Sequence, residues 1–342
     1  MRTLHVVLPN DIDDPRTPSG GNVYDRRLLR GLSARGWTVV ELAVPGSWPA
    51  PSQDERAFLA RTLAALPDDA LVLVDGLVGS AAPDELVPAA KRLRLVPLVH
   101  MPLGDDAEAK VLTAARAVVT TSPWTRDLLD VPPPVTVATP GVDPAPLAPG
   151  SPAGSRLLCV AAVSPHKGHD LLTDALTSVG QPYECAYVGS LTREPEFVAA
   201  LRDRAPGTIR FAGPLVGADL DAAYARADLL VLASRGETYG MVVTEALARG
   251  VPVLATAVGG LPDALGEAPD GSVPGLLVPP EDPGALAAAL RRWLTDADLR
   301  ARLRRSAVAR RETLTGWDVT AGIVADVLTG IPAVPAGFPG DA

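Results

Sequence analysis

Two carboxylates lie close to a predicted helix start in the run SRGETYGMVVTEALARGVPVLATAVGGL, from Ser234 to Leu261. Glu237 belongs to the loop before the helix, and Glu245 follows it with seven residues between them. Glu245 is about two helical turns further along the chain, so its side chain can return towards the same site. Paired carboxylates at such a place suit a ligand that carries several hydroxyl groups.

The start of this helix offers amide groups as well as carboxylates. Gly240 lies where the chain must turn tightly into the helix, and Gly250 is placed to end it. The N–H groups of Gly240, Met241 and Val242 lack helical partners and point at any anion above them. An anion held by amides, with carboxylates nearby, is a layout suited to a phosphorylated ligand such as a nucleotide sugar.

Two further polar residues follow predicted strands. Lys167 lies in the turn Ser-Pro-His-Lys-Gly after the strand predicted for residues 156–163, where a cation can neutralise a diphosphate. His100 ends the apolar strand predicted for residues 95–100. A lone turn lysine is more often a solvated surface residue, and a histidine at a strand end is as often a capping or core residue as a ligand contact. Neither position defines a site by itself.

The N-terminal half opens with a glycine-rich turn. A short strand at residues 4–8 is followed by a polar loop that ends in Gly20 and Gly21, then by helical spacing up to Gly36 and a strand at 38–44. This order predicts one βαβ unit. The glycine pair does not form G-x-G-x-x-G, so a dinucleotide fingerprint is absent. A structural turn explains the pair at least as well as a phosphate contact.

The run from Glu237 resembles the donor-site signature of the large retaining glycosyltransferase family 4, which has the GT-B fold of two Rossmann-like domains. That family has a loop glutamate, an aromatic–glycine pair, a second glutamate eight positions on, a G-x-P-V run and a Gly-Gly-Leu-Pro run, in this order. The matching residues are Glu237, Tyr239-Gly240, Glu245, Gly250-Val-Pro-Val253 and Gly259-Gly-Leu-Pro262. The resemblance is strong over residues 157–294 and weaker over the first 150 residues.

The resemblance implies transfer of a hexosyl group from a nucleotide diphosphate sugar to a hydroxyl acceptor, with retention by front-face attack. Glu237 would accept hydrogen bonds from donor-sugar hydroxyls, and Glu245 would hold the ribose hydroxyls. The main chain at Leu215 would read the base edge, and Lys167 would neutralise the diphosphate. His100, as a neutral imidazole, would donate a hydrogen bond to a sugar hydroxyl. A UDP-sugar is slightly preferred over GDP-mannose, and the acceptor is not specified.

We therefore expect catalytic roles for His100, Lys167 and Glu237. The residues expected to bind the donor are Gly20, Gly21, Leu215, Gly240, Met241, Val242 and Glu245. One departure from the family pattern concerns the phosphate site, where the family has an arginine five residues before the lysine and this chain has Ala162. Either Lys167 works with the main-chain amides alone, or another basic residue such as Arg235 or His166 replaces the arginine.

Strand and helix patterns alternate along both halves, which predicts an α/β protein with two doubly wound domains facing a cleft. A change to proline, glycine and alanine marks the linker. A final helix is expected to cross back to the first domain. The expected divisions are an acceptor-binding domain at 1–143, a linker at 144–155, a donor domain at 156–312, the crossing helix at 313–330 and a disordered tail at 331–342.

Composition excludes several classes of protein. The net charge of −9, from 31 basic and 40 acidic residues, argues against a nucleic-acid binder. No apolar run reaches the roughly 18 residues that span a bilayer. Cys159 and Cys185 fall in apolar runs that indicate buried thiols of a reduced compartment. We expect a cytoplasmic protein without transmembrane segment, metal or cofactor, whose partners are a nucleotide sugar and a small-molecule, glycan or lipid acceptor.

Other functions stay open at this point. A sugar-nucleotide epimerase or a phosphorylase can use the same architecture, although the sequence offers no convincing set of additional acid and base groups. A glycoside hydrolase also needs two carboxylates, but the α/β repeat and the nucleotide-type helix start argue against it. Ala162 leaves a further alternative, a nucleotide-sugar-binding protein without turnover.

Overall fold

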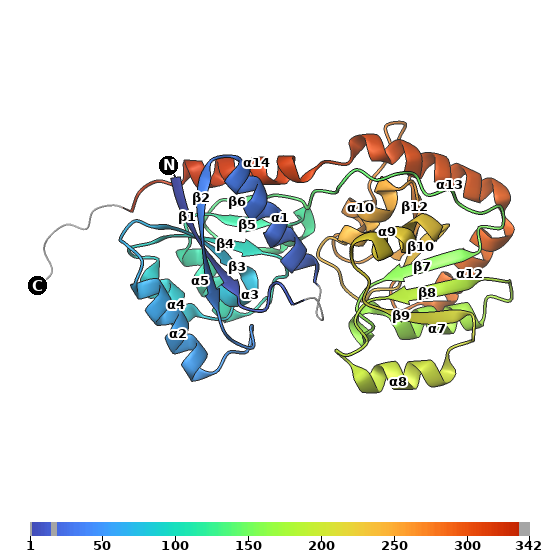
Figure 1. Ribbon diagram of the computed structural model, residues 1–342, viewed down its shortest axis with the longest axis horizontal. Helices are drawn as coiled ribbons and strands as arrows, with labels where there is room; N and C mark the ends of the chain where they lie inside the picture. The colour runs from blue at the N-terminus through green and yellow to red at the C-terminus, as the bar shows by residue number, and fades with distance from the viewer. Residues whose placement is uncertain (1, 15–18, 335–342) are drawn as a thin grey trace, which may run out of the picture. The chain divides into compact units, whose positions relative to one another are not determined.

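The computed structural model describes residues 2–14 and 19–334, and its chain divides into two compact units (Figure 1). The described part of the first unit consists of residues 2–14, 19–140 and 317–334. The second unit contains residues 141–316. The C-terminal helix therefore belongs to the first unit although it follows the second in the chain.

The first unit is a parallel six-stranded sheet in the order β2-β1-β3-β4-β5-β6, with helices between the strands. Its strands are β1 (Arg2–Pro9), β2 (Trp37–Val44), β3 (Leu71–Asp75), β4 (Arg94–Val99), β5 (Val118–Thr120) and β6 (Val135–Val137). Its helices are α1 (Gly20–Ala34), α2 (Gln53–Ala64), α3 (Gly76–Gly79), α4 (Pro83–Ala89), α5 (Asp106–Ala114), α6 (Pro123–Leu128) and α14 (Trp317–Gly330).

Alternation along β1 divides the core of this unit between the two faces of the sheet. Leu4, Val6 and Leu8 join the apolar cluster that includes α1 and α14, whereas Val7 joins the cluster under α2 and α4. Successive strand side chains point to opposite faces, so helices must cover both sides of a sheet with this pattern.

The last helix, α14, packs on α1, as predicted for a helix that returns to the first domain. The two helices approach closely, because a Cβ atom added at Gly31 would lie 2.5 Å from the Cβ of Ala321. The predicted disordered tail is wrong for residues 331–334: Ile331 is buried in the core, and the amide of Val334 donates to Asp69 over 2.7 Å. Residues 335–342 of that predicted tail lie outside the described residues.

The second unit has its own parallel sheet in the order β12-β11-β10-β7-β8-β9. Its strands are β7 (Arg156–Val160), β8 (Glu184–Val188), β9 (Ile209–Gly213), β10 (Leu229–Leu232), β11 (Val253–Thr256) and β12 (Gly275–Val278). Its helices are η1 (Pro165–Lys167), α7 (His169–Thr177), α8 (Pro195–Arg204), α9 (Gly217–Arg226), α10 (Met241–Ala248), α11 (Leu261–Leu265), α12 (Pro283–Thr295), α13 (Ala297–Arg310) and η2 (Arg311–Thr313).

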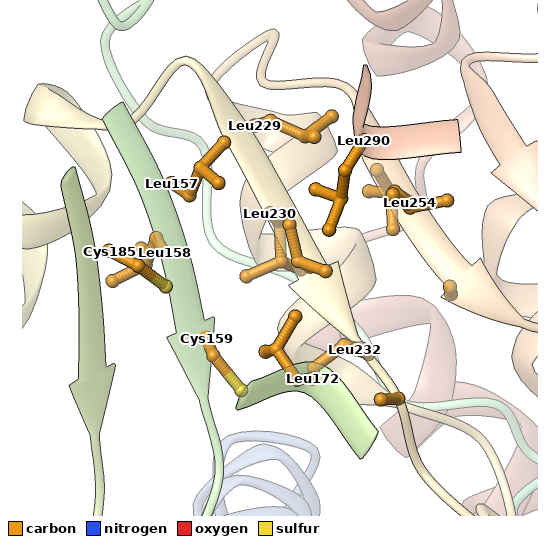
Figure 2. Packing of buried hydrophobic residues seen from close by; sticks show 14 of the residues in the cluster. Leu157, Leu158, Cys159, Leu172, Cys185, Leu229, Leu230, Leu232, Leu254 and Leu290 are labelled. Atoms are coloured by element: carbon orange, nitrogen blue, oxygen red, sulfur yellow. The ribbon is translucent and has the colours of Figure 1, made fainter. Parts of the chain in front are cut away.

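The core of the second unit is a single apolar cluster around β7, β10 and β11. Figure 2 shows strand residues such as Leu158, Leu230 and Leu254 beside Leu172 of α7 and Leu290 of α12. Cys159 and Cys185 are buried in the same cluster as free thiols. Continuous apolar runs of this kind are expected for parallel strands that are covered on both faces.

The proline-rich segment 144–155 has no helix or strand and lies along the second unit. Ala148 donates its amide to the carbonyl of Arg249 over 2.9 Å, and Arg311 donates to the carbonyl of Ala145 over 2.7 Å. Backbone groups of a segment without regular structure need such partners. No described helix is long and apolar enough to cross a bilayer.

Candidate functional site

The turn that carries Lys167 lies beside the loop that carries Glu237. Nζ of Lys167 is 2.6 Å from Oε1 of Glu237, and both side chains are partly buried, with 24% and 14% of their surface exposed. The hydroxyl of Ser234 also donates to Oε1, over 3.3 Å. Among the described residues no contact is recorded for Oε2 of Glu237, so this oxygen is available to accept hydrogen bonds from a ligand.

The position of Lys167 depends on the close packing of its turn against the end of β10. Gly168 has φ +64°, and a Cβ atom there would lie 1.8 Å from the carbonyl oxygen of Ala233. Only glycine can adopt this positive φ and also lie so close to the Ala233 carbonyl without moving the backbone. The amide of Arg235 donates to the carbonyl of His166 over 2.9 Å and joins the two loops directly.

The Gly-Gly pair at 259–260 packs directly against the backbone of the loop that carries Glu237. A Cβ at Gly259 would lie 1.7 Å from the carbonyl oxygen of Glu237, and one at Gly260 would lie 2.2 Å from that of Thr238. The amide of Gly260 donates to the carbonyl of Glu237 over 2.9 Å. The glycine pair of the sequence motif therefore allows the backbone to hold Glu237 in place, and α11 begins directly after it.

The start of α10 has no capping side chain. Gly240 is the N-cap residue, with φ +96°, and no side chain caps the helix. The first turn contains no acidic residue, and no hydrogen bond is recorded for the amides of Met241 and Val242 within the described chain. Free amides and the helix dipole at such a start favour a negatively charged group. Leu215 follows β9 and is half-buried against the core of the second unit.

Glu245 lies one turn into α10 and is held by Tyr224 of α9. The phenol donates to Oε2 over 2.7 Å. Burial raises the pKa of Glu245, although the Tyr224 hydrogen bond and the charge of Arg249 act in the opposite direction. Tyr224 was not among the predicted residues, because nothing in the sequence connects positions 21 residues apart on two different helices.

Arg235 has partners that keep it from acting as the missing phosphate cation. Its guanidinium forms a bidentate ion pair with Asp170, at 2.9 Å for both bonds, and lies 2.6 Å from Glu281. Paired arginines of this kind have their charge neutralised locally. His166 is exposed and lies beside Gly236. Among the lysines and arginines of these two described loops, Lys167 is therefore the residue that contacts Glu237.

The predicted residues of the first unit form a separate cluster around His100. Nε2 of His100 lies 2.8 Å from Oδ1 of Asp25 and 3.7 Å from Oδ2 of Asp75. Gly21 lies against the ring, since a Cβ there would be 3.4 Å from Cδ2 of His100. Gly20 is exposed at the first position of α1, so both glycines belong to the helix rather than to the loop before it.

Charge in this cluster favours the protonated imidazole. Burial alone would lower the pKa of His100, but the charge and hydrogen bond of Asp25, with the charge of Asp75, outweigh it and raise the pKa. Burial, with the charge of Asp25, also raises the pKa of Asp75 to about 7, against the opposing effects of His100 and the Leu77 and Val78 amides. His100 is expected from the sequence to act as a neutral imidazole, whereas the buried carboxylates beside it favour the cation.

The sequence patterns do not predict a role for Asp25 or Asp75. The one available signal was their position, since Asp25 lies one turn into α1 and Asp75 ends a fully buried strand. One ligand atom each from Asp25, Asp75 and His100 lies within 4.8 Å of the others, a spacing that a metal ion could use. The short contact between His100 and Asp25 already accounts for this arrangement as an ion pair.

The chain is similar to known proteins over much of its length. Residues 154–296 match the family model described as "Glycosyl transferases group 1". A D-inositol 3-phosphate glycosyltransferase from Kineococcus radiotolerans is 35% identical over 254 residues, which are 64% of this chain and 58% of that protein. The chain thus spans somewhat more than half the length of this curated relative.

Two solved structures have the same fold. Sucrose-phosphate synthase from Thermosynechococcus elongatus has a TM-score of 0.77 at 21% identity, with 96% of this chain and 98% of that chain covered. HepE from Anabaena, in complex with UDP-glucose, has a TM-score of 0.74 at 18% identity and covers 96% and 100%. Residues 154–296 therefore form a domain of the glycosyl transferases group 1 family, and the chain as a whole has the GT-B glycosyltransferase fold.

Proposed function

We propose that this protein transfers a hexosyl group from a nucleotide diphosphate sugar to a hydroxyl acceptor, with retention of anomeric configuration. The observation that carries the proposal is the 2.6 Å pair of Lys167 and Glu237 in the unit that contains the open start of α10. A cation and free amides suit a diphosphate, and a carboxylate with one available oxygen suits sugar hydroxyls. We call Lys167, Glu237 and the start of α10 the candidate donor site.

The proposed roles follow from this geometry. Lys167 and the amides of Met241 and Val242 stabilise the diphosphate as it departs, while Glu237 positions the sugar through Oε2. Glu245, oriented by Tyr224, accepts hydrogen bonds from the ribose hydroxyls. His100 belongs to the first unit and donates a hydrogen bond to a sugar hydroxyl. The departing phosphate accepts the proton of the acceptor hydroxyl, so no separate protein base is required.

The donor is proposed to be a UDP-sugar in preference to GDP-mannose. HepE, whose fold this chain shares, was solved with UDP-glucose, and this supports the choice. The curated relatives are named for D-inositol 3-phosphate, so a cyclitol phosphate is the first acceptor to screen, followed by glycans and lipids. We further propose that transfer needs no metal ion, and addition of a chelator should then leave turnover unchanged.

The first experiment is thermal unfolding of the purified chain with UDP, GDP, ADP, dTDP and their sugars. A ligand at 100 times its Kd stabilises the folded state by about 2.7 kcal/mol. A selective upward shift with one nucleotide would define the donor class, and the anomeric configuration of the product, measured by NMR, would test retention. No shift with any nucleotide would reject the donor site proposed for the second unit.

A second function is favoured by one observation: in the described loops at 161–168 and 233–240, no cation other than Lys167 pairs with Glu237. Ala162 replaces the family's arginine, and Arg235 is occupied by Asp170 and Glu281. A protein with this site could bind a nucleotide sugar without transferring it. Thermal stabilisation by a nucleotide sugar, without turnover against the acceptors named above, would favour this binding function over transfer.

A further inference from the structure

A second site lies in the second unit, at the end of the sheet opposite to the candidate donor site. A cavity of about 410 Å³ opens over the amino ends of β7, β8 and β9 and the last turn of α9. These three strands are neighbours at one edge of the sheet (Figure 1). Arg156 of β7, Arg210 of β9 and Arg226 of α9 line it, so its cations come from three different elements.

The charge of this cavity is opposite to that of the chain. The whole protein has a net charge of −9, whereas the cavity is lined by three arginines and a single carboxylate, Glu184. None of the three guanidinium groups has an ion pair with a carboxylate of the described residues. Elsewhere in the unit, arginines such as the exposed Arg204 and the partly buried Arg249 pair with aspartates. Local unpaired positive charge in an acidic protein favours an anionic ligand.

The floor of the cavity is apolar. Leu158 of β7 is buried, and Ala186 of β8 lies next to it in the sheet register, with Arg210 as the next residue in the same row. Side chains two residues apart share a face, so Arg156 lies on the same face as Leu158. The arrangement combines a carbon-lined floor with a cationic rim.

We propose that this cavity binds a small organic phosphate, with the carbon skeleton on the floor and the phosphate among Arg156, Arg210 and Arg226. Guanidinium groups present planar pairs of donors that match phosphate oxygens, and several of them can share one phosphate. Volumes of 300–1,000 Å³ are typical of small-molecule sites. The site has no residue in common with the candidate donor site. Arg156 begins β7, whereas the turn that carries Lys167 follows the other end of this strand, and the length of β7 is roughly 13 Å at about 3.3 Å per residue.

The test is isothermal titration of the full chain with two probes, inorganic pyrophosphate and glucose 6-phosphate. Because phosphate can also enter the candidate donor site, all titrations use a Lys167→Ala background, which weakens that site. Replacement of Arg156, Arg210 or Arg226 by alanine should weaken binding about tenfold each, the effect of one charge-assisted hydrogen bond. The matched control is Arg291→Ala, which removes an exposed arginine of α12 outside the cavity and should change nothing.

Glu184 gives a test of opposite sign. Glu184→Gln keeps the shape of the side chain and removes the lone negative charge, so both probes should bind several-fold more tightly. Raised salt should weaken binding to the parent chain. These two effects distinguish an anion site from a cavity that takes a neutral ligand.

Two outcomes would overturn the proposal: no binding of either probe, and equal binding when all three arginines are replaced. Where neither probe binds, cosedimentation with phosphatidic acid vesicles would show that the cavity takes a lipid headgroup rather than a free phosphate. The result is independent of glycosyl transfer, since none of the varied arginines belongs to the candidate donor site.

Discussion

Nζ of Lys167 lies 2.6 Å from Oε1 of Glu237, across 70 residues of sequence. The two side chains come from turns that follow the carboxyl ends of β7 and β10, which are adjacent strands. Ligands of open α/β sheets bind at this edge. The ion pair orients both groups before a ligand arrives, which reduces the reorganisation needed during reaction.

The pair should behave as one unit in catalysis. Under the proposed function, Lys167→Ala and Glu237→Gln should each lower kcat/KM about 100-fold, the magnitude for loss of one group that stabilises developing charge. The double variant should lose much less than the product of the two effects, because each substitution already removes the interaction. Lys110→Ala, an exposed lysine of α5, serves as the control for charge. Full activity of Glu237→Gln would show that our role for Glu237 is wrong.

The glycine pair should be essential for the geometry of the loop. Gly259→Ala places a Cβ 1.7 Å from the carbonyl oxygen of Glu237 at φ +54°, so the loop must move. We expect loss of nucleotide-dependent thermal stabilisation and a cost in unfolding free energy of about 1–3 kcal/mol. Gly330→Ala is the matched control, because a Cβ there meets nothing within 4 Å. Unchanged nucleotide binding by Gly259→Ala would mean that the loop does not form the donor site.

Tyr224 should control the protonation of Glu245. Its hydrogen bond lowers the pKa of Glu245, which burial raises, so Tyr224→Phe should raise that pKa further. The carboxylate is then protonated at a higher pH than in the parent. Lowering the pH should therefore increase the donor KM of Tyr224→Phe earlier than that of the parent. Tyr183→Phe, which alters a tyrosine next to β8, provides the comparison. A pH profile of donor KM that is identical in Tyr224→Phe and the parent would contradict this role.

Local sequence patterns predicted most of the elements, because parallel strands and amphipathic helices each have a clear signature. The strands at residues 4–8, 38–44, 95–100 and 156–163 were anticipated, with boundaries that differ by a few residues. The short helices α3 and α11 were not, since four or five residues carry too little periodicity. The glycine pair before α11 was recognised as a motif, but its close contact with the Glu237 carbonyl follows only from the folded backbone.

The partners of the site residues were the least predictable part. His100 was identified from its strand end, yet Asp25 is 75 positions away and Asp75 ends a different strand. Arg235 was considered as a phosphate cation, and its pairs with Asp170 and Glu281 could not be read from spacing. Pairing depends on which loops the sheet order brings together, and that order is not encoded in local patterns.

The contact between His100 and Asp25 gives a prediction that does not depend on activity. The charge and hydrogen bond of Asp25 raise the pKa of His100, so Asp25→Asn should lower that pKa. The measurement is an NMR titration of the imidazole signals, with His100→Gln to assign the resonance among the four histidines of the chain. Asp130→Asn, an exposed carboxylate after α6, should leave the titration unchanged. An unaltered pKa in Asp25→Asn would show that the two groups do not interact in solution.

Asp75 should make the first unit less stable as pH rises. Its pKa is about 7 in the fold against 3.8 for the free side chain, so between these values the unfolded chain releases the proton first. Stability is therefore present in full below about pH 4 and is lost as pH rises through 7. Asp75→Asn cannot titrate, and it should lose less stability between pH 5 and pH 8 than the parent.

Hydrogen exchange of the β1 and β3 amides measures this difference, because these strands report on the first unit alone. In the parent, the free energy of opening should decrease as pH rises. In Asp75→Asn it should change less, and the values for the parent and the variant should be most similar at low pH. Asp130→Asn should follow the parent, since its carboxylate is exposed. Parallel pH profiles of the parent and Asp75→Asn would mean that burial does not hold the Asp75 proton. The raised pKa of His100 would then be the remaining source of any loss of stability at alkaline pH.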